Sequence, residues 1–481
     1  MHIIPSFFSF VFLFSLFSSC SKEDEKIFIR ISERNPNYFE YSDGKPYIPI
    51  GPNICWERFE KDETKVIELY EQRFRNLSEN GGNYTRIWLS APFFDVEHSK
   101  ATSYDDAIKK RIDKILALAE KYDIKIKFCL ENFRALEDYP AIFPGSVPFD
   151  KPIYSKKYGG PLESTEDYFN TPEGKELFTR KLAFYSKYYK DNPAIFGWEL
   201  WNEINAVHIP DKPESVLKWT NTMLPLLKTY FPNHLVMQSL GSFDRKSSFN
   251  LYEQFVTLPS NEIAQVHRYL DPGASWEICQ APMDILASNA VLELQNMVEN
   301  KPIVLSEVGA VEANHSGPSL LYQKDTLGVL LHDMLFAPFF SGAAGPGQSW
   351  HWQFYIEKNN LWWHFGRFEK AIRGINPIIE NFIPLFCEID GVRLYVLKGK
   401  SNILIWGRDS KSDWVTEIVE GKNPEKRNLN IPLSKLLISD KQYNVKMYDP
   451  WNDLWSKIKI ENNGLTIPQF ERSFVIRIEN E

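Results

Sequence analysis

The segment AIFGWELWNEIN, residues 194–205, runs from an apolar stretch into an amide and a carboxylate. Isoleucine, phenylalanine, tryptophan and leucine in one short run are typical of a strand that is buried on both faces. The run ends in Asn202 and Glu203, at the point where such a strand would surface. Parallel strands of α/β proteins carry their chemistry at their C-terminal ends. Glu203 is therefore the first candidate for a catalytic acid.

Strand-like runs of this kind recur along the chain and alternate with helical patterns. The eight runs are residues 47–51, 83–89, 124–131, 194–201, 234–240, 263–270, 302–310 and 349–355. The segments with helical spacing of apolar residues are 64–79, 105–122, 173–190, 214–230 and 284–299. Eight strands alternating with helices predict an α/β fold, a closed (β/α)8 TIM barrel. The alternative, an open doubly wound sheet, usually has a glycine-rich phosphate loop after its first strand, and this chain has none there.

The two ends of the chain follow other patterns. Residues 27–45 alternate around Asp43-Gly44 and predict a short β-hairpin. From about residue 387 onward, short alternating runs between turn residues predict a small all-β sandwich. We therefore assign residues 21–45 to a linker and hairpin, 46–385 to the barrel and 386–481 to the sandwich. The sandwich is expected to be a packing appendage, with glycan binding as the other possibility.

Composition restricts the classes of partner. The net charge is −8 and no basic run occurs, so we expect no contact with nucleic acid. Aromatic residues make up 15% of the chain, which suits stacking on sugar rings but is also explained by a large aromatic core. Histidines on separate segments lack the spacing of metal ligands, so we expect no metal and no cofactor. These histidines are His208, His267, His315 and His351.

The N-terminus has the pattern of an exported protein. Residues 3–17 are apolar and are followed by Ser18-Ser19-Cys20, which predicts a signal peptide over residues 1–20. The pattern resembles a bacterial lipoprotein signal with Cys20 as the lipidated residue, and residues 21–25 resemble the acidic export tag of Bacteroidetes lipoproteins, although no Lys or Arg precedes the apolar block. We expect a lipoprotein of the outer membrane or cell surface, or otherwise a secreted or periplasmic protein. A lipid on Cys20 would be its only membrane contact.

A second carboxylate ends the seventh strand-like run. In PIVLSEVGA, residues 302–310, Glu307 follows an apolar stretch as Glu203 does. The ends of strands four and seven lie across the mouth of a closed eight-stranded barrel, so the two glutamates can face each other. Glycoside hydrolysis uses two carboxyl groups that flank the scissile bond. Glu199 belongs to the same run as Glu203 but precedes the strand end, so we expect a structural role for it.

This arrangement resembles the clan A glycoside hydrolases, most closely glycoside hydrolase family five, the cellulase/mannanase family, over roughly residues 45–384. The resemblance implies a retaining O-glycosyl hydrolase (EC 3.2.1.-) with Glu203 as acid/base and Glu307 as nucleophile, no cofactor, and a carbohydrate as its partner. Other residues of this chain match supporting positions of the family. These positions are the arginine that hydrogen-bonds the nucleophile, the His-x-Tyr of strand six and the tryptophan platform at the cleaved sugar. The matching residues are Arg86, His267, Tyr269, Trp350 and Trp352.

Simple electrostatics agrees with these roles. An apolar site raises the pKa of Glu203, and the positive charge of Arg86 favours an ionised Glu307. Tyr269 is expected to donate to Glu307, and Asn202 to the sugar 2-hydroxyl. His267 is expected to position Tyr269 or Glu203. Trp350 and Trp352 alternate along one strand, so both are expected on one face, one as the platform and one packed inside.

One departure from the family concerns the third strand, where many members carry a histidine. Here the strand ends in Cys129, Glu131 and Asn132, and Glu131 either binds a substrate hydroxyl or is a structural carboxylate. Residues 133–170 are expected to wall the cleft, which favours short oligosaccharides or chain ends.

The resemblance implies β-mannan or β-glucan as substrate. A non-catalytic glycan-binding surface lipoprotein and an exo-acting β-mannosidase- or β-galactosidase-like enzyme are the alternatives; disulfide pairing and oligomeric state are left open.

Overall fold

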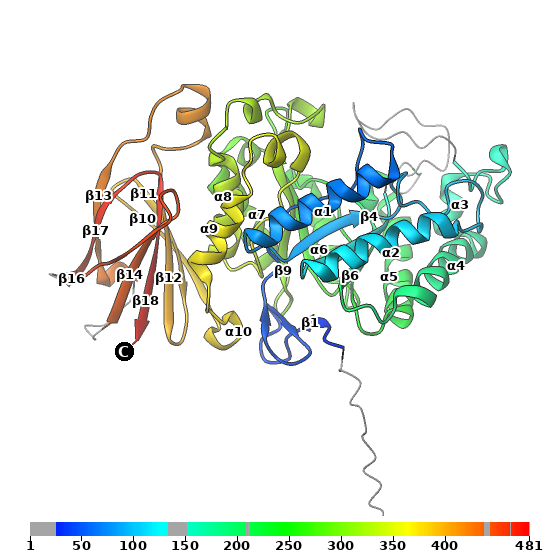
Figure 1. Cartoon of the computed structure of the whole chain (residues 1–481), viewed down its shortest axis with the longest axis horizontal. Helices are drawn as coiled ribbons and strands as arrows, with labels where there is room; N and C mark the ends of the chain where they lie inside the picture. The colour runs from blue at the N-terminus through cyan, green and yellow to red at the C-terminus, as the bar shows by residue number, and fades with distance from the viewer. Residues whose placement is uncertain are drawn as a thin grey trace, which may run out of the picture.

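The computed structural model describes residues 26–132, 152–207, 209, 212–436, 443–461 and 463–480. Within these residues the chain forms a small N-terminal sheet, a (β/α)8 TIM barrel and a C-terminal region of antiparallel strands (Figure 1). Both parts of the predicted fold class are therefore confirmed. None of the described helices is long and apolar enough to cross a membrane.

Six barrel strands are regular and parallel, and backbone hydrogen bonds add the other two. The regular strands are β4 (Tyr84–Trp88), β5 (Lys125–Glu131), β6 (Ile195–Trp201), β7 (Leu235–Met237), β8 (Ala264–Leu270) and β9 (Ile303–Ala310). The N–H of Glu262 donates to the carbonyl of Val236, 3.1 Å, between β7 and β8. Residues 344–350 pair with β9, and the N–H of Asn53 donates to the Ser349 carbonyl, 3.0 Å. A parallel bridge from Asn53 to Arg86 then closes the barrel.

The predicted eighth strand is too long. Strand-like pairing ends at Trp350, where its N–H donates to the carbonyl of Val308, 2.8 Å. His351 has a positive φ of 62°, and residues Trp352–Glu357 form a helical turn. The expectation that Trp350 and Trp352 share one face of a strand is therefore wrong, because the backbone leaves the extended conformation between them.

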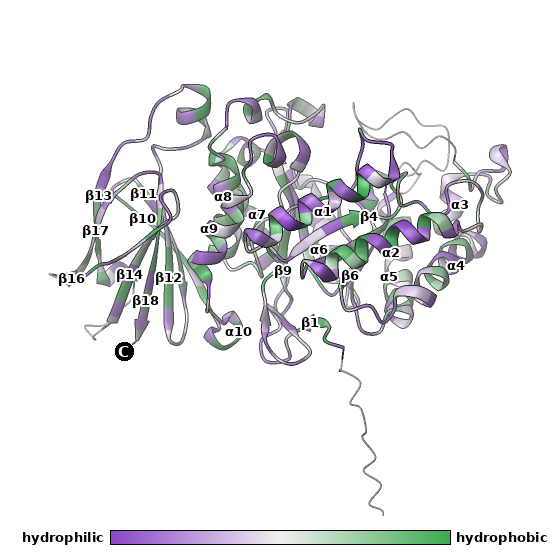
Figure 2. Cartoon of the chain, viewed as in Figure 1, coloured by the Kyte–Doolittle hydropathy of each residue, from purple (hydrophilic) through white to green (hydrophobic). Residues whose placement is uncertain are grey.

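Helices cover the barrel where the sequence shows capped, amphipathic segments. The main ones are α1 (Glu63–Glu79), α2 (Asp106–Lys121), α4 (Pro172–Tyr189), α5 (Lys212–Tyr230), α6 (Phe249–Val256), α7 (Met283–Gln295), α8 (Val329–Phe340) and α9 (Trp363–Ile372), with short α3 (Thr165–Asn170) and α10 (Pro377–Glu380). Asp62 and Asp105 accept backbone N–H groups at the starts of α1 and α2. Figure 2 shows hydrophilic and hydrophobic residues alternating along both helices. Helix α8 has no such alternation because it is buried on every side.

The N-terminal sheet closes the bottom of the barrel. It pairs β1 (Ile29–Ile31), β2 (Phe39–Tyr41) and β3 (Pro46–Tyr47) antiparallel, so the segment has three strands rather than a two-stranded hairpin. The predicted turn joins β2 to β3, with Gly44 at φ 87°. Phe39 and Tyr47 pack on Phe196, near the N-terminal end of β6, with ring centroids 5.3 and 5.9 Å away.

The C-terminal strands form a sandwich that begins at Ile383. One sheet has the order β10 (Ile383–Ile389), β11 (Val392–Lys398), β12 (Asn402–Asp409), β18 (Ser473–Asn480), β14 (Tyr443–Asp449), β15 (Leu454–Lys457). The facing sheet has the order β13 (Arg427–Pro432), β17 (Gly464–Phe470), β16 (Ile460–Glu461). Buried aliphatic side chains such as Leu394, Ile431 and Ile467 fill the space between them.

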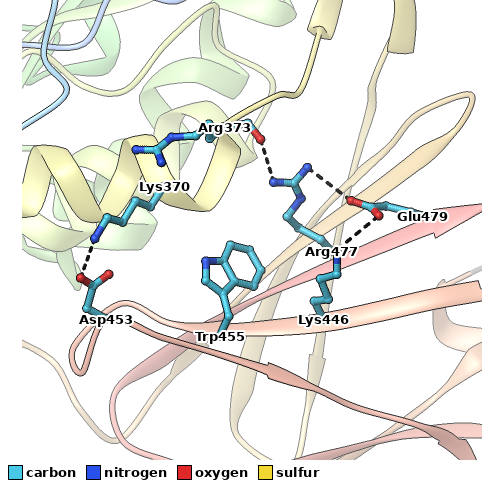
Figure 3. A pocket seen from close by; sticks show the side chains of 7 residues that line it. All are labelled: Lys370, Arg373, Lys446, Asp453, Trp455, Arg477 and Glu479. Carbon is cyan, nitrogen blue, oxygen red and sulfur yellow. Dashed lines mark hydrogen bonds and ion pairs between the residues drawn. The ribbon is translucent and has the colours of Figure 1, made fainter.

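Buried charges attach the sandwich to the barrel. The guanidinium of Arg393 donates to Asp284 of α7, 2.6 Å, and that of Arg408 donates to Asp333 of α8, 2.7 Å. At the outer edge of this interface a polar cavity of about 490 Å³ lies between α9 and the sheet (Figure 3). A salt bridge from Lys370 to Asp453, 2.6 Å, and a hydrogen bond from Arg477 to the carbonyl of Arg373, 2.8 Å, cross it, so we assign it to domain packing. The lining residues are Lys370, Arg373, Lys446, Asp453, Trp455, Arg477 and Glu479.

Candidate active site

The C-terminal ends of the barrel strands bring the predicted residues together. Arg86 lies on β4, the pair Asn202-Glu203 directly follows β6, and Glu307 lies on β9. His267 and Tyr269 lie on β8, beside β9 in the sheet. Hydrogen bonds join Glu203 to His267. Arg86 donates to Asn202 and Glu307, and Tyr269 also donates to Glu307.

Glu203 sits where the chain turns away from its strand. Its backbone is left-handed, with φ 50° and ψ 54°, a conformation that is unfavourable for a residue other than glycine and recurs at functional sites. The N–H of Glu203 donates to the hydroxyl of Ser239, 3.2 Å. Its carboxyl Oε1 lies 2.7 Å from Nδ1 of His267. Of the two roles expected for His267, the structure therefore shows the contact with Glu203.

Glu307 is held at both oxygens. The guanidinium Nη1 of Arg86 donates to Oε1, and the hydroxyl of Tyr269 donates to Oε2 over 2.6 Å. The residue is only 3% exposed, so both contacts act with little screening by water. The carboxylate is thereby fixed in orientation as well as in charge.

The two glutamates lie close together. A carboxylate oxygen of Glu203, a carboxylate oxygen of Glu307 and a ring nitrogen of His267 all lie within 4.8 Å of one another. Retaining glycosidases hold their carboxyl groups about 5–5.5 Å apart, whereas inverting enzymes leave about 6.5–9.5 Å for a water molecule. The limit of 4.8 Å lies below the inverting range and agrees with the closer spacing of retaining enzymes.

The same three side chains also have the donor atoms of a three-ligand metal site. The guanidinium of Arg86 already contacts Glu307, and its positive charge opposes a cation at that carboxylate. The donor set therefore fits proton transfer better than metal binding.

A buried charge network orients Arg86. Its Nε and Nη2 donate to the two oxygens of Glu199, over 2.8 and 3.0 Å, and Nη2 also donates to Oδ1 of Asn202, 2.7 Å. The Nζ of Lys127 lies 3.5 Å from Glu199 and donates to Gln265 over 2.6 Å. Burial alone would raise the pKa of Glu199, but Arg86 and Lys127 outweigh it and hold that pKa below its usual value. Glu199 has the structural role expected of it, as a rigid anchor for Arg86.

Sequence reasoning missed Lys127 and Gln265. The only signal for them is a charged or polar residue in an otherwise apolar strand, in KIKFCLE and AQVHRYL. Such residues also occur on strand faces that meet solvent. Both are buried here, Lys127 at 1% exposure and Gln265 at 3%, inside the barrel.

The environment separates the proton affinities of the two glutamates. Burial, and then the charge of Glu307, raises the pKa of Glu203 well above its usual value. Burial also raises the pKa of Glu307, although Arg86 and Tyr269 oppose the rise. Arg86 therefore does not hold the pKa of Glu307 at or below its ordinary value, because burial prevails. A single proton shared by the pair is expected on Glu203, since among the described residues a cation contacts Glu307 and none contacts Glu203.

The ring of His267 is neutral. Burial, followed by the charges of Arg86 and Lys127, lowers its pKa well below the usual value. It therefore shares a hydrogen bond with Glu203 without adding a positive charge to the site.

Tryptophans line one side of the barrel mouth. Trp56, Trp88, Trp350 and Trp352 pack together with ring centroids from 4.7 to 5.6 Å apart. Trp352 is 2% exposed, whereas Trp56 and Trp350 are partly exposed. Trp350 is thus placed to act as a platform with Trp352 packed behind it. Trp56, which follows the first barrel strand, was missed by sequence reasoning.

Glu131 is the last residue of β5, at the same end of the barrel as the catalytic pair. It is buried and forms an ion pair with Lys181, whose Nζ is also 3.0 Å from Glu97. The carbonyl of Glu131 accepts the N–H of Asn202, 2.7 Å. Of its two expected roles, the arrangement favours the structural carboxylate.

Other predictions lie partly or wholly outside the described residues. Cys20, the signal peptide and residues 133–151 of the expected cleft wall are among them. Four cysteines that are described carry free thiols, so none of them pairs with another. They are Cys55, Cys129, Cys279 and Cys387.

Comparisons with known proteins agree with this geometry. The family model described as Cellulase (glycosyl hydrolase family 5) matches residues 53–330. Mannan endo-1,4-beta-mannosidase 7 of Arabidopsis thaliana is 26% identical over 290 residues, which is 55% of this chain and 65% of that protein. The probable mannan endo-1,4-beta-mannosidase F of Aspergillus flavus is 24% identical over 313 residues, 59% of this chain and 62% of that protein. The chain thus spans under two thirds of the length of either relative.

A solved structure extends the likeness in fold to the sandwich. The glycoside hydrolase family 5 protein of Bacteroides vulgatus superposes with a TM-score of 0.58 at 14% identity, covering 95% of this chain and 94% of that one. At this identity the likeness concerns the fold. The family model covers more than half of the chain, including both glutamates and the supporting residues up to Tyr269. The chain belongs to glycoside hydrolase family 5.

Proposed function

We propose that this protein is a retaining glycoside hydrolase that cleaves β-linked mannan-type glycans by double displacement. The observation that carries the proposal is the pair Glu203 and Glu307, with carboxylate oxygens within 4.8 Å of each other. Each member has the partner that its role requires: a neutral histidine on the acid/base and a cation on the nucleophile.

In the first step Glu307 attacks the anomeric carbon and forms a glycosyl ester. The bond from that carbon to the leaving-group oxygen breaks, and the proton of Glu203 moves to this oxygen. The raised pKa of Glu203 keeps the proton available at neutral pH. Tyr269 and Arg86 hold the attacking carboxylate, and the amide NH2 of Asn202 is the group that would bind the sugar 2-hydroxyl, because its oxygen accepts from Arg86.

In the second step water replaces the leaving group. Glu203, now ionised, takes a proton from the water. The water oxygen attacks the anomeric carbon as the ester bond to Glu307 breaks. Two inversions give net retention of the β configuration, and both carboxyl groups return to their starting states. The neutral His267 can donate from Nδ1 to Oε1 of Glu203 in both states, while the other carboxyl oxygen of Glu203 carries the proton or the negative charge.

The choice of mannan rests on the relatives. The Arabidopsis and Aspergillus proteins both bear the name mannan endo-1,4-beta-mannosidase. A panel of β-linked manno- and gluco-oligosaccharides of increasing length, with aryl β-mannosides, β-glucosides and β-galactosides, tests this choice. Faster cleavage of manno-oligosaccharides supports it, and faster cleavage of gluco-oligosaccharides contradicts it. The pattern of products distinguishes internal cleavage from release of single sugars.

The mechanism is tested by product stereochemistry and by two variants. Proton NMR during the first minutes of hydrolysis should show the β anomer as the initial product, and an initial α anomer would sink the retaining mechanism. Glu307→Gln should be inactive on every substrate. Glu203→Ala should lose most activity on oligosaccharides and least on aryl glycosides with good leaving groups, which need no protonation. Glycan binding without hydrolysis in the unmodified protein would favour the non-catalytic alternative.

We also propose that the protein is anchored by a lipid on Cys20 at the outer membrane or cell surface. The support is the apolar block of residues 3–17 followed by Ser18-Ser19-Cys20 and an acidic segment. In a bacterial expression host the protein should incorporate labelled palmitate and sediment with membranes, and Cys20→Ala should do neither. Equal labelling of the two forms would refute the anchor.

A further inference from the structure

Three side chains that the proposed mechanism does not use form a hydrogen-bonded chain beside the catalytic pair. Nδ1 of His315 lies 2.8 Å from Oδ2 of Asp271, and its Nε2 lies 2.8 Å from Oγ of Ser242. The three residues follow β9, β8 and β7 respectively, so they join the loops of three consecutive barrel strands. We refer to them as the Ser242–His315–Asp271 relay.

The relay lies close to both proposed catalytic groups, through residues that neighbour them. A Cβ added to Gly241, the neighbour of Ser242, would stand 3.7 Å from the carboxyl carbon of Glu203. The ring of His315 packs edge-on against Tyr269, the donor to Glu307, with centroids 5.2 Å apart. The relay therefore borders the place where the scissile bond must lie.

Its position around the barrel indicates which sugar it meets. Trp56, Trp88 and Trp350 belong to barrel strands one, two and eight, whereas the relay belongs to strands five, six and seven. In a closed barrel these two groups face each other across the mouth. If the tryptophans hold the sugar that Glu307 attacks, the relay faces the sugar that leaves with the proton of Glu203.

Hydrogen-bond directions follow from the chemistry of the groups. Asp271 is a buried carboxylate that accepts, so Nδ1 of His315 carries the hydrogen and donates to it. When this imidazole is neutral, its Nε2 accepts and the hydroxyl of Ser242 donates to it. With its hydrogen committed, Oγ of Ser242 offers only lone pairs to a ligand. Ser242 is partly exposed, and the side chain of His315 is 26% exposed.

We propose that the relay forms the recognition site for the leaving-group sugar, in which Oγ of Ser242 accepts a hydrogen bond from one sugar hydroxyl. This inference rests on the proposed hydrolase function. Ser242 binds substrate directly, whereas His315 and Asp271 are positioning residues that set the direction of its hydrogen. The ligand class is a glycosyl unit with a free hydroxyl at the contacted carbon; an aryl or fluoride leaving group makes no such contact.

The test compares substrates that differ only in the leaving group. Ser242→Ala should lower kcat/KM for manno-oligosaccharides about three- to tenfold, the worth of one neutral hydrogen bond, and lower it far less for an aryl β-mannoside. Ser247→Ala, an exposed serine on the same loop, is the matched control and should change neither. His315→Ala combined with Ser242→Ala should lose little more than either alone, because the two side chains act as one unit.

Fluorinated substrates identify the hydrogen-bond direction. Fluorine accepts weakly but cannot donate, so replacing the contacted hydroxyl of the leaving sugar should slow the unmodified protein and leave Ser242→Ala indifferent to the replacement.

Several results would overturn the inference. If Ser242→Ala lowers kcat/KM equally for oligosaccharide and aryl substrates, the relay has only a structural role. If it lowers kcat/KM for neither, the relay does not take part in substrate recognition. Covalent labelling of Ser242 by a fluorophosphonate probe would make it a nucleophile instead of a binding group. If the unmodified protein hydrolyses neither substrate, the proposed function fails, which is distinguishable from all of these.

Discussion

Removing the hydroxyl of Tyr269 tests whether its hydrogen bond stabilises the ionised form of Glu307. In Tyr269→Phe the ring and its packing are retained, but Glu307 loses the donor 2.6 Å from its Oε2. A hydrogen bond to a charged group contributes about 1.5–3 kcal/mol. At about 1.4 kcal/mol per pKa unit, losing it raises the pKa of Glu307 by roughly one to two units. The sign is upward because Tyr269 stabilises the ionised form, and burial has already raised that pKa.

The assay is the pH dependence of kcat/KM, which reports the ionisation of the free enzyme. The proposed reaction needs Glu307 ionised and Glu203 protonated, so activity falls on the acid side as Glu307 takes up a proton. Tyr269→Phe should therefore move the acid limb to higher pH by one to two units. The alkaline limb, governed by Glu203, should move much less, because Tyr269 makes no hydrogen bond to Glu203 among the described contacts.

A matched control separates this effect from general damage. Tyr355 is another buried tyrosine that donates to a buried carboxylate, Asp325, over 2.5 Å, but it does so behind the site. Tyr355→Phe should lower stability and leave the acid limb in place. If Tyr269→Phe leaves the acid limb unchanged or moves it to lower pH, the assignment of Glu307 as the group that must be ionised is refuted.

Three further predictions concern stability and metal dependence. Arg408→Ala should reduce the free energy of unfolding by about 3–5 kcal/mol in urea titrations, because it leaves Asp333 buried without its cation, and Arg408→Lys should restore part of the loss. Burial lowers the pKa of His234 to about 4 from 6.5. The neutral His234 therefore makes its full contribution to the free energy of unfolding above pH 6.5, and this contribution is lost as the pH falls toward 4. In His234→Gln the fall in unfolding free energy over this pH range should be smaller by about 3 kcal/mol, the free-energy equivalent of the pKa shift. Equal stability-versus-pH profiles for the two proteins would contradict the lowered pKa of His234. Prolonged dialysis against a chelator should leave the rate unchanged, and restoration of lost activity by a divalent cation would reopen the metal role of Glu203, His267 and Glu307.

Local sequence patterns identify most of the barrel and its two central residues. An apolar run that ends in a carboxylate is visible in residues 194–205 and again in 302–310. Such a signal is local because burial of a parallel strand requires consecutive apolar residues, and its end is marked by the first polar ones. The same logic misjudged the eighth strand, since the alternation of SWHWQFY continues past His351 while its left-handed backbone ends the strand. Helix α8 escaped prediction because a helix buried on all sides has no polar stripe.

The contacts that tune the chemistry depend on closure of the barrel. Arg86 meets Glu199, Asn202 and Glu307 across separations of 113, 116 and 221 residues, and Ser242 meets His315 across 73. No local pattern specifies these pairings, because hydrogen bonds require atoms to approach within about 3 Å and the sequence carries no distances between strands. The chain alone thus identifies which carboxylates can react. Only the closed barrel gives the two carboxyl groups different proton affinities, as the proposed acid and nucleophile roles require, because burial and the position of one guanidinium set those affinities.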